Sequence, residues 1–412
     1  GGGGGVGVAA GSGGGGGAAA VAAGPGGGKL PAADDAKRTK EKNKRLRKEG
    51  VPVRASAKKQ VQLFSHLHQY DMSVSLTAGI PFGAANKVHP SFIRLGLKHS
   101  EGITSGSTNR CTTLLQAFRD FIDDFTPSPN KQYSVDLLAA ISPLISFIKQ
   151  CRQLSDSMAN TIKFLKKEIS ELPPDLSNEA AKQSLHGTID KFLQERIVLA
   201  QQVITEAARS KIQDGDVVLV HGGSHLVVQV LLGARALGLN FRVVVVDSRP
   251  KCTGIDVLEK CIAAGIKSTY VLISAVSYVM RDVTKVMLSA HAILANGFVM
   301  GRVGSSLISM VAKAHLVPVL VVCETYKFSD RVQTDAFVFN ELGDPNVVAK
   351  LPFDKPGKLG GWEDIPSLGI LNLVFDVTPP EFIDMVVTDI GMIPCTSVPV
   401  VLRVKDQQDQ QK

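Results

Sequence analysis

The chain has 412 residues, of which 44% are hydrophobic and 20% are charged, and its formal net charge is +8. This length allows two or three domains of about 150 residues each. The charge is local, because residues 37–59 hold eleven Lys or Arg against Glu41 and Glu49, whereas residues 60–412 are neutral. A neutral body argues against a broad nucleic-acid-binding surface on the folded part, since such surfaces need clustered cations.

The first 59 residues are predicted to be a disordered tail. Residues 1–28 include sixteen glycines, and such a tract buries too little surface to offset its backbone entropy. The basic segment that follows favours a transient helix around residues 40–48, which Pro52 would close. Two interpretations of this segment remain open: a solvated linker, or an arm that docks on RNA or an acidic partner. Residues 60–87 are expected to form an extended linker.

Residues 88–210 are predicted to form an all-helical domain. Apolar residues recur there at three- and four-residue steps, which is typical of amphipathic helices. Pro173 and Pro174 interrupt the pattern between two of the helices. The expected helices span residues 110–125, 135–152, 157–172 and 178–211.

Residues 211–405 are predicted to form a Rossmann-like domain. Short β-branched runs alternate with helical patterns, which indicates a doubly wound, mostly parallel sheet with helices on both faces. The fold class is therefore α/β, an all-helical domain followed by this sheet. A last helix is expected at 376–391, a last strand at 398–404, and a polar tail at 406–412. The other expected strands span 217–220, 241–246, 268–273, 292–294 and 317–322, and the other helices span 226–237, 254–264, 276–283 and 305–314.

Turns at the carboxyl ends of the predicted strands are the candidate ligand site. Gly222, Gly223 and Ser224 follow the first strand and offer backbone N–H groups to a phosphate, although a tight turn alone explains them. Asp247 and Arg249 follow the second strand, where an acid often holds a ribose hydroxyl; here Asp247 can equally cap a turn.

Two further turns belong to the same candidate site. Asn296 lies in a turn before Ser305 and Ser306, whose hydroxyls fit either a phosphate or a helix N-cap. Lys327 follows another strand together with Glu324, as a phosphate partner beside a general base, or as a pair that anchors a loop.

No metal site, cofactor or membrane segment is predicted. The spacing of His221, His225 and His291 matches no standard ligand set. The six scattered cysteines form no C-x-x-C pair, so they are expected to be reduced thiols. With no signal peptide and no apolar run near the ~20 residues that span a bilayer, the expected location is the cytosol.

Several motifs together resemble one family. The chain is similar to the regulatory subunits of translation initiation factor 2B, most closely the delta type, from about residue 60 to 405. The motifs that carry this resemblance are Leu63–Leu67, Val88–Pro90, Phe241–Pro250, Ala290–Gly297, Val322–Phe328 and Asn372–Glu381.

The resemblance extends to sugar-phosphate isomerases that act on methylthioribose 1-phosphate and ribose 1,5-bisphosphate. Their catalytic cysteine would fall on Gly222 and their aspartate on His291, so the resemblance implies a chain without the catalytic pair. An isomerase with substitute groups such as Asp247 and Glu324 stays the alternative. A dinucleotide-dependent dehydrogenase is disfavoured by the missing glycine fingerprint.

The resemblance also implies partners. The chain would be a non-catalytic regulatory subunit of the complex that exchanges GDP for GTP on initiation factor 2. It would assemble with alpha and beta regulatory subunits and with gamma and epsilon catalytic subunits. It would also help to bind the alpha subunit of initiation factor 2 and sense its phosphorylation in the stress response. The subunit-interface candidates, which otherwise fill the domain's own core, are Phe337, Leu371, Asn372, Phe382, Ile383 and Val386.

Overall fold

The computed structural model describes residues 1–2, 32–57, 59–71, 88–350 and 359–410. The chain divides into two compact units, Gly1–Arg45 and Leu46–Lys412. Helix α1 (Ala32–Lys48) begins in the first unit and contains the helix expected around residues 40–48. Most of the glycine-rich tract lies in residues 3–31, outside the described residues, so the disorder expected there stays a prediction.

The disorder predicted for residues 1–59 is wrong for the last part of that range. Val51 is buried in the same core cluster as Leu46, and the Arg54 Nη1 atom donates to the Cys151 carbonyl at 2.9 Å. Ser56 forms an isolated β-bridge with Tyr70. Sparse apolar side chains among the charges are enough to anchor this segment. Of the expected linker, residues 72–87 lie outside the described residues, and Gln62–Phe64 form a short 3-10 helix, η1.

The helical part of the second unit follows the amphipathic pattern closely. Its core contains Phe92, Phe118, Leu137, Ile148 and Leu165, each at most 1% exposed. The long helix expected at 178–211 forms with a π-helical stretch in its middle. The elements are α2 (Pro90–Ser100), α3 (Ser107–Asp124), α4 (Tyr133–Cys151), α5 (Asp156–Ser170), α6 (Asn178–Phe192), η4 (Leu193–Leu199) and α7 (Ala200–Arg209).

Helix α4 is, by length and composition alone, apolar enough to cross a membrane. It is one such helix among the described residues, and Leu137, Ile141, Leu144 and Ile148 on it are at most 1% exposed within the helical core. A core helix of this kind passes the same test of length and hydropathy, so the helix is weak evidence for a membrane span.

The α/β part contains a seven-stranded sheet with the order β11-β10-β7-β4-β1-β2-β3. Its strands pair in parallel except β11, which is antiparallel to β10. The predicted doubly wound sheet is therefore confirmed. The strands are β1 (Val217–His221), β2 (Arg242–Asp247), β3 (Lys267–Leu272), β4 (Lys285–Ser289), β7 (Val319–Val322), β10 (Met385–Thr388) and β11 (Gly391–Ile393).

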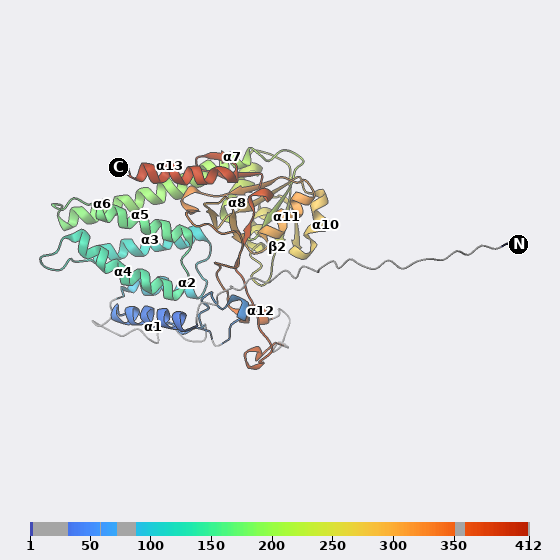
Figure 1. Ribbon diagram of the computed structural model, residues 1–412. Coiled ribbons are helices and arrows are strands. Elements are labelled where there is room, and N and C mark those ends of the chain that lie inside the picture. The colour runs from blue at the N-terminus through green and yellow to red at the C-terminus, as the bar shows by residue number, and fades with distance from the viewer. Residues whose placement is uncertain (3–31, 58, 72–87, 351–358, 411–412) are drawn as a thin grey trace. The chain divides into compact units, whose positions relative to one another are not determined.

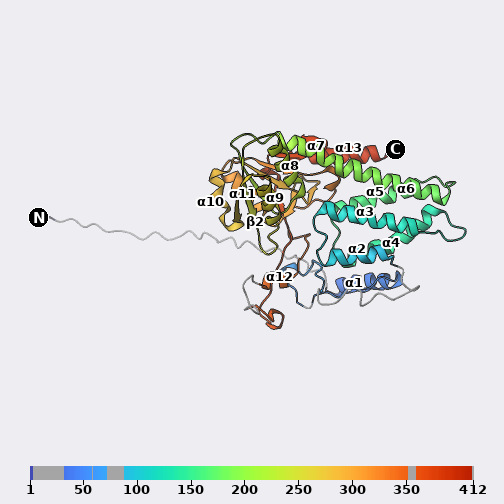
Figure 2. The same ribbon diagram turned by 180° about the vertical axis from the view of Figure 1, so that it is seen from behind.

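Helices cover both faces of this sheet, because alternate residues of each strand point to opposite sides. Val218 and Val220 of β1 pack with α7 (Ala200–Arg209), α8 (His225–Ala236) and α9 (Ile255–Ala263). Val217 and Leu219 pack with α10 (Val276–Val279), α11 (Ser305–Ala314) and α13 (Val398–Gln410). Figure 1 shows α10 and α11 toward the viewer, and Figure 2 shows α8 and α9.

A second sheet was not anticipated. The strand expected at 292–294 forms as β5 (Ala292–Leu294), but it belongs to a four-stranded sheet with β6 (Val299–Arg302), β8 (Phe328–Ser329) and β9 (Phe375–Thr378). The main sheet instead contains β4, a strand that was not predicted. Lys285 and Ser289 bracket only three buried residues there, so the apolar run was too short to stand out.

The secondary structure predicted for the C-terminal part is wrong. Residues 376–391, expected as a helix, contain β9, the 3-10 helix η9 (Pro380–Phe382) and β10, because Pro379 and Pro380 prevent a helix interior there. Residues 398–404, expected as a strand, lie in helix α13. Val398 and Leu402 are buried whereas Val400 and Val404 are about half exposed. This is the four-residue period of a helix.

The last described elements are short. Helix α12 (Pro345–Ala349) begins at the N-cap Asp344, whose side chain accepts from the Asn346 N–H. Helix α13 continues to Gln410, past the expected start of a polar tail at residue 406. The remaining 3-10 helices are η5 (Ile273–Ala275), η6 (Met280–Asp282), η7 (Thr325–Lys327), η8 (Trp362–Asp364) and η10 (Cys395–Ser397).

Candidate functional site

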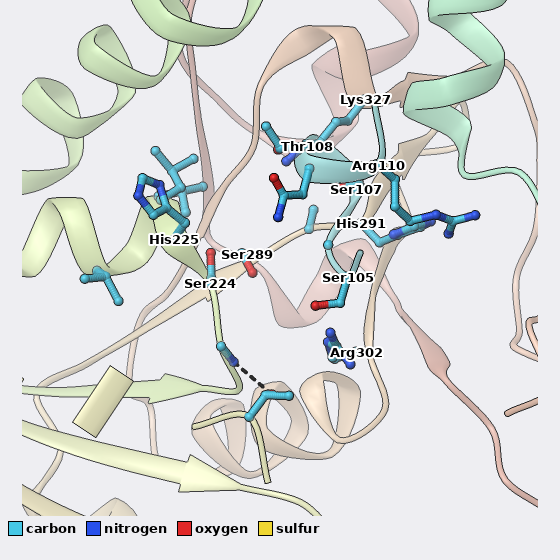
Figure 3. Close-up of a pocket in the computed structure, with 18 of the residues that line it drawn as sticks. Ser105, Ser107, Thr108, Arg110, Ser224, His225, Ser289, His291, Arg302 and Lys327 are labelled. Atoms are coloured by element: carbon cyan, nitrogen blue, oxygen red, sulfur yellow. Dashed lines mark hydrogen bonds between the residues drawn. The ribbon is translucent and has the colours of Figure 1, made fainter. Parts of the chain in front are cut away.

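A cavity of about 480 Å³ opens where the helical part meets the carboxyl ends of β1, β4 and β7. The chain runs from β1 to β2 on one side and from β4 to β7 on the other, so this is the switch point of the sheet. Ligands of doubly wound folds bind at such a point. Figure 3 shows side chains from both parts around the opening.

The first wall of the cavity is the start of helix α3. Gly106 is its N-cap with φ +83°, a left-handed conformation that favours glycine, and no side chain caps this helix. Ser105, Ser107 and Thr108 line the cavity beside it. An uncapped N-terminus of an 18-residue helix combines free N–H donors with the positive end of the helix dipole, so this wall suits an anion.

Cations dominate the lining. The cavity wall includes Arg110, Arg152, Lys251, Lys260, Arg302 and Lys327 against the carboxylates of Asp256 and Glu324. Burial, and then repulsion from Arg152, lowers the pKa of Arg110 to about 10. Burial is also the main cause that lowers the pKa of Lys251 and of Arg302. An anion placed among these groups would stabilise their charged forms.

One carboxylate partly balances this cluster. The Glu341 Oε1 atom lies 2.5 Å from Nε of Arg152, and its Oε2 atom lies 3.7 Å from Nη1 of Arg110. Arg110 is only 2% exposed, and this contact stabilises its charge beside the hydrogen bond from Nη2 to the Gln153 carbonyl. The segment after β8 is thereby joined to helices α3 and α4 behind the cavity wall.

A second buried pair closes the cavity beside β7. Lys327 Nζ lies 2.6 Å from Glu324 Oε2, and Gln201 Nε2 donates to Glu324 Oε1 at 3.0 Å. Burial alone would raise the pKa of Glu324, but Lys327 and Gln201 together hold it below its usual range. A carboxylate that stays ionised in an ion pair is a poor proton shuttle.

His291 lies against the cavity with its imidazole 4.1 Å from the ring of Phe375, centroid to centroid. Burial, and then the nearby cations, lower the pKa of His291 well below its usual value. The imidazole is therefore neutral near pH 7 and cannot donate as an imidazolium acid. No cysteine is among the described residues that line the cavity.

The structure brings together only half of the sequence-predicted ligand site. Gly223, Ser224, His291 and Lys327 line the large cavity. Gly222 and Arg249 line a separate, much smaller cavity beside it.

The other two predicted residues have structural roles. Asp247 is 1% exposed, and its carboxylate accepts from Ser248 N, Gly254 N and Tyr270 Oη at 2.7–3.1 Å. It therefore holds the turn before α9, the alternative that the sequence left open. Asn296 donates to the Gln333 carbonyl at 3.0 Å, in the second sheet and outside the cavity.

The predicted interface residues separate into two groups. Phe337 is 41% exposed, and Leu371 and Phe382 are half-buried. Asn372, Ile383 and Val386 are buried within the chain, and the last two belong to the core of the sheet.

Most of the cations that line the cavity are not among the residues predicted for the site. Arg110 and Arg152 fall within the expected amphipathic helices, and Arg302 lies in a segment with no motif. The one available signal was the Ser105-Gly106-Ser107-Thr108 run before a helix, which resembles the other glycine turns. Among the described residues, no group of three or more His, Cys, Asp or Glu could hold a metal ion.

Comparisons with known proteins place this cavity in a family context. A family model described as "Initiation factor 2 subunit family" matches residues 103–395. The chain is 40% identical over 370 residues to "Translation initiation factor eIF2B subunit delta" of Dictyostelium discoideum, which covers 88% of this chain and 59% of that protein. It is 42% identical over 348 residues to the protein of the same name from Schizosaccharomyces pombe, covering 84% of this chain and 73% of the relative.

An enzyme and a solved structure are also similar. A ribose 1,5-bisphosphate isomerase of Pyrococcus furiosus is 33% identical over 221 residues, which are 53% of this chain and 66% of that enzyme. The crystal structure of the tetrameric eIF2B-beta2-delta2 complex from C. thermophilum contains a chain that matches with a TM-score of 0.69 at 27% identity. That match covers 82% of this chain and 98% of the other.

Proposed function

Because this chain belongs to the initiation factor 2 subunit family, we propose that it is a non-catalytic regulatory subunit of the complex that exchanges GDP for GTP on initiation factor 2. The observation that carries the proposal is the extent of the similarity. Relatives named as delta subunits align at 40–42% identity over 84–88% of the chain, whereas the isomerase aligns at 33% over 53%.

The proposed loss of catalysis rests on two positions. By resemblance, Gly222 and His291 stand where the isomerases carry a cysteine and an aspartate. Gly222 has φ +63°, and the nearest atom to an added Cβ would be Thr253 Oγ1 at 3.5 Å. There is therefore room for a side chain at position 222, but glycine carries none. Cys323 lies in the sequence between Val322 and Glu324, which line the cavity. Its thiol is fully buried, however, and burial raises its pKa. On this proposal, positions 222 and 291 supply neither the thiol nucleophile nor the carboxylate that relays the proton.

One proposed partner follows from the name of a solved relative, and the others follow from the family resemblance. A solved relative forms a beta2-delta2 complex, so the first partner would be the beta-type regulatory subunit. The alpha regulatory subunit and the gamma and epsilon catalytic subunits would complete the assembly in the cytosol. The substrate contact would be the alpha subunit of initiation factor 2, read in its phosphorylated and unphosphorylated forms.

Co-assembly tests this proposal. Sedimentation velocity of the full chain, alone and mixed with the beta-type subunit of the same organism at micromolar concentration, should show a new species containing both chains. A matched mixture with an unrelated protein of equal size is the control. If the two chains sediment independently across this range, the proposal fails.

The cationic cavity favours one alternative, a surviving sugar-phosphate isomerase. It predicts that the purified chain converts ribose 1,5-bisphosphate to its ketose and that a Lys327→Met variant slows this reaction. Absence of turnover at high enzyme concentration, with the Pyrococcus furiosus enzyme active in parallel, would eliminate this alternative.

A further inference from the structure

Helix α1 carries a row of cations along one side. Lys40, Lys44, Arg47 and Lys48 are all exposed. Their spacing of four, seven and eight residues puts them on one side of a helix with 3.6 residues per turn, over a length of roughly 12 Å. We refer to these four residues as the cationic stripe.

The C-terminal end of the same helix is anchored through a residue on the opposite side. Leu46 is 6% exposed and belongs to the helical core together with Val51. A step of 100° per residue puts Leu46 well away from the cationic stripe around the helix axis. The last turn of the helix is thus fixed through Leu46, and the four side chains of the stripe are exposed.

The charge of the stripe is not part of a general basic character. The chain is neutral over residues 60–412, and its net charge of +8 is the sum of +9 in residues 37–59 and −1 in residues 1–36. Of the acidic residues in that range, Glu41 flanks the stripe and none lies within it. Such local, same-sign charge contributes nothing to folding, because like charges at four-residue spacing destabilise a helix.

We propose that the cationic stripe of α1 binds the phosphodiester backbone of RNA without reading its sequence. Three of its four cations are lysines, which act as flexible point charges toward phosphates. No aromatic or large apolar side chain interrupts the stripe. Protein interfaces are depleted in lysine and centre on aromatic and apolar anchors, so an acidic protein partner fits the stripe less well.

Salt dependence measures the contact directly. Each phosphate neutralised on a single strand contributes about −0.7 to the slope of log K against log salt, so four contacts give about −3. Fluorescence anisotropy of a labelled 20-nucleotide oligouridine with the full chain should follow this slope. Affinity should fall about 50-fold between 50 and 200 mM salt.

A charge-neutral variant provides the test, and a matched variant provides its control. The K40Q/K44Q/R47Q/K48Q variant retains good helix formers and should reduce the slope by about 3. The K191Q/K267Q/R281Q/K313Q variant removes the same charges from exposed positions of the body and should leave the slope unchanged. Circular dichroism and the melting temperature report whether each variant is folded.

Two results would overturn the proposal. One is an equal salt slope for the wild-type chain and the stripe variant. The other is tighter binding of a 20-residue polyglutamate than of the oligouridine at the same salt, since that would assign the stripe to an acidic protein. The measurement needs no partner subunit, so its outcome is independent of the proposed assembly.

Discussion

Glu341 Oε1 lies 2.5 Å from Arg152 Nε, and this contact joins the segment after β8 to the end of helix α4. Both side chains are about 15% exposed, and the neighbouring Arg110 is 2% exposed. A Glu341→Gln variant would leave two largely buried guanidinium groups without their counter-ion. We expect it to lower the free energy of unfolding by about 3 kcal/mol in urea denaturation.

An exposed ion pair is the matched control for this change. Lys163 and Asp330 also join the helical part to the segment after β8, at 2.9 Å, but they are 69% and 59% exposed. Asp330→Asn should cost less than about 1 kcal/mol because solvent screens such pairs. Equal costs for the two variants would show that the Glu341 contact contributes no more than a surface pair.

Alanine substitutions at the two glycines of the turn after β1 should lower the stability of the chain by different amounts. Gly222 has a positive φ, and an added Cβ would meet only Thr253 Oγ1 at an ordinary contact distance of 3.5 Å, so Gly222→Ala should cost about 1 kcal/mol of stability from backbone strain alone. At Gly223 an added Cβ would lie 2.7 Å from the Thr253 carbonyl oxygen. Gly223→Ala must therefore move backbone and should cost about 3 kcal/mol. Urea denaturation of both variants checks the order, and a larger loss at Gly222 would contradict this account of the turn.

The buried carboxyl of Asp376 should make the folding stability of the chain depend on pH. Its carboxylate accepts from Gly304 N at 2.7 Å and Ser306 N at 2.9 Å, but burial outweighs these bonds and raises its pKa to about 7. The folded chain then binds more protons than the unfolded chain between about pH 4 and 7. This carboxyl should therefore make stability fall as pH rises through that window.

An Asp376→Asn variant isolates this effect. The free energy of unfolding of the wild-type chain minus that of the variant should decrease from pH 4 to 7, by an amount on the order of 2 to 4 kcal/mol. Urea titrations at half-unit pH steps measure it. Parallel curves for the two proteins would mean that folding does not raise the pKa of this carboxyl.

The arrangement of the fold could be read from the sequence where burial and periodicity agree. The run Val217–Val220 is buried on both faces and forms β1 as expected. The helix and the strand that were wrongly predicted in the C-terminal part show where periodicity alone fails. Residues 398–404 form a strand-like run rich in β-branched valine, yet core contacts of Val398 and Leu402 make it helical. Local preference was overruled by tertiary packing, which a single sequence does not display.

The candidate site was predictable only on its sheet side. Strand-end turns are marked in the sequence by glycine and serine, so Gly223 and Ser224 could be found. Arg110 and Arg152 come from helices that are distant in sequence, and an arginine on a helix looks the same whether it faces solvent or a cavity. Asp247 had two chemically equal explanations, and only the hydrogen bonds to Gly254 and Tyr270 distinguish them.

Substitutions at the neighbouring residues Phe382 and Ile383 distinguish a contact with another subunit from packing inside the chain. Ile383 is 7% exposed in the core cluster of the sheet, so Ile383→Ala should destabilise the isolated chain by about 3 kcal/mol. Phe382 is half-buried at the end of η9, so Phe382→Ala should cost about 1 kcal/mol or less in the isolated chain.

If the proposed beta-type partner covers this surface, Phe382→Ala should weaken association at least tenfold, because aromatic side chains anchor such interfaces. Sedimentation equilibrium with the partner measures the affinity, and urea denaturation measures stability. An unchanged affinity for the Phe382 variant would remove this residue from the interface and leave it as part of the chain's own surface.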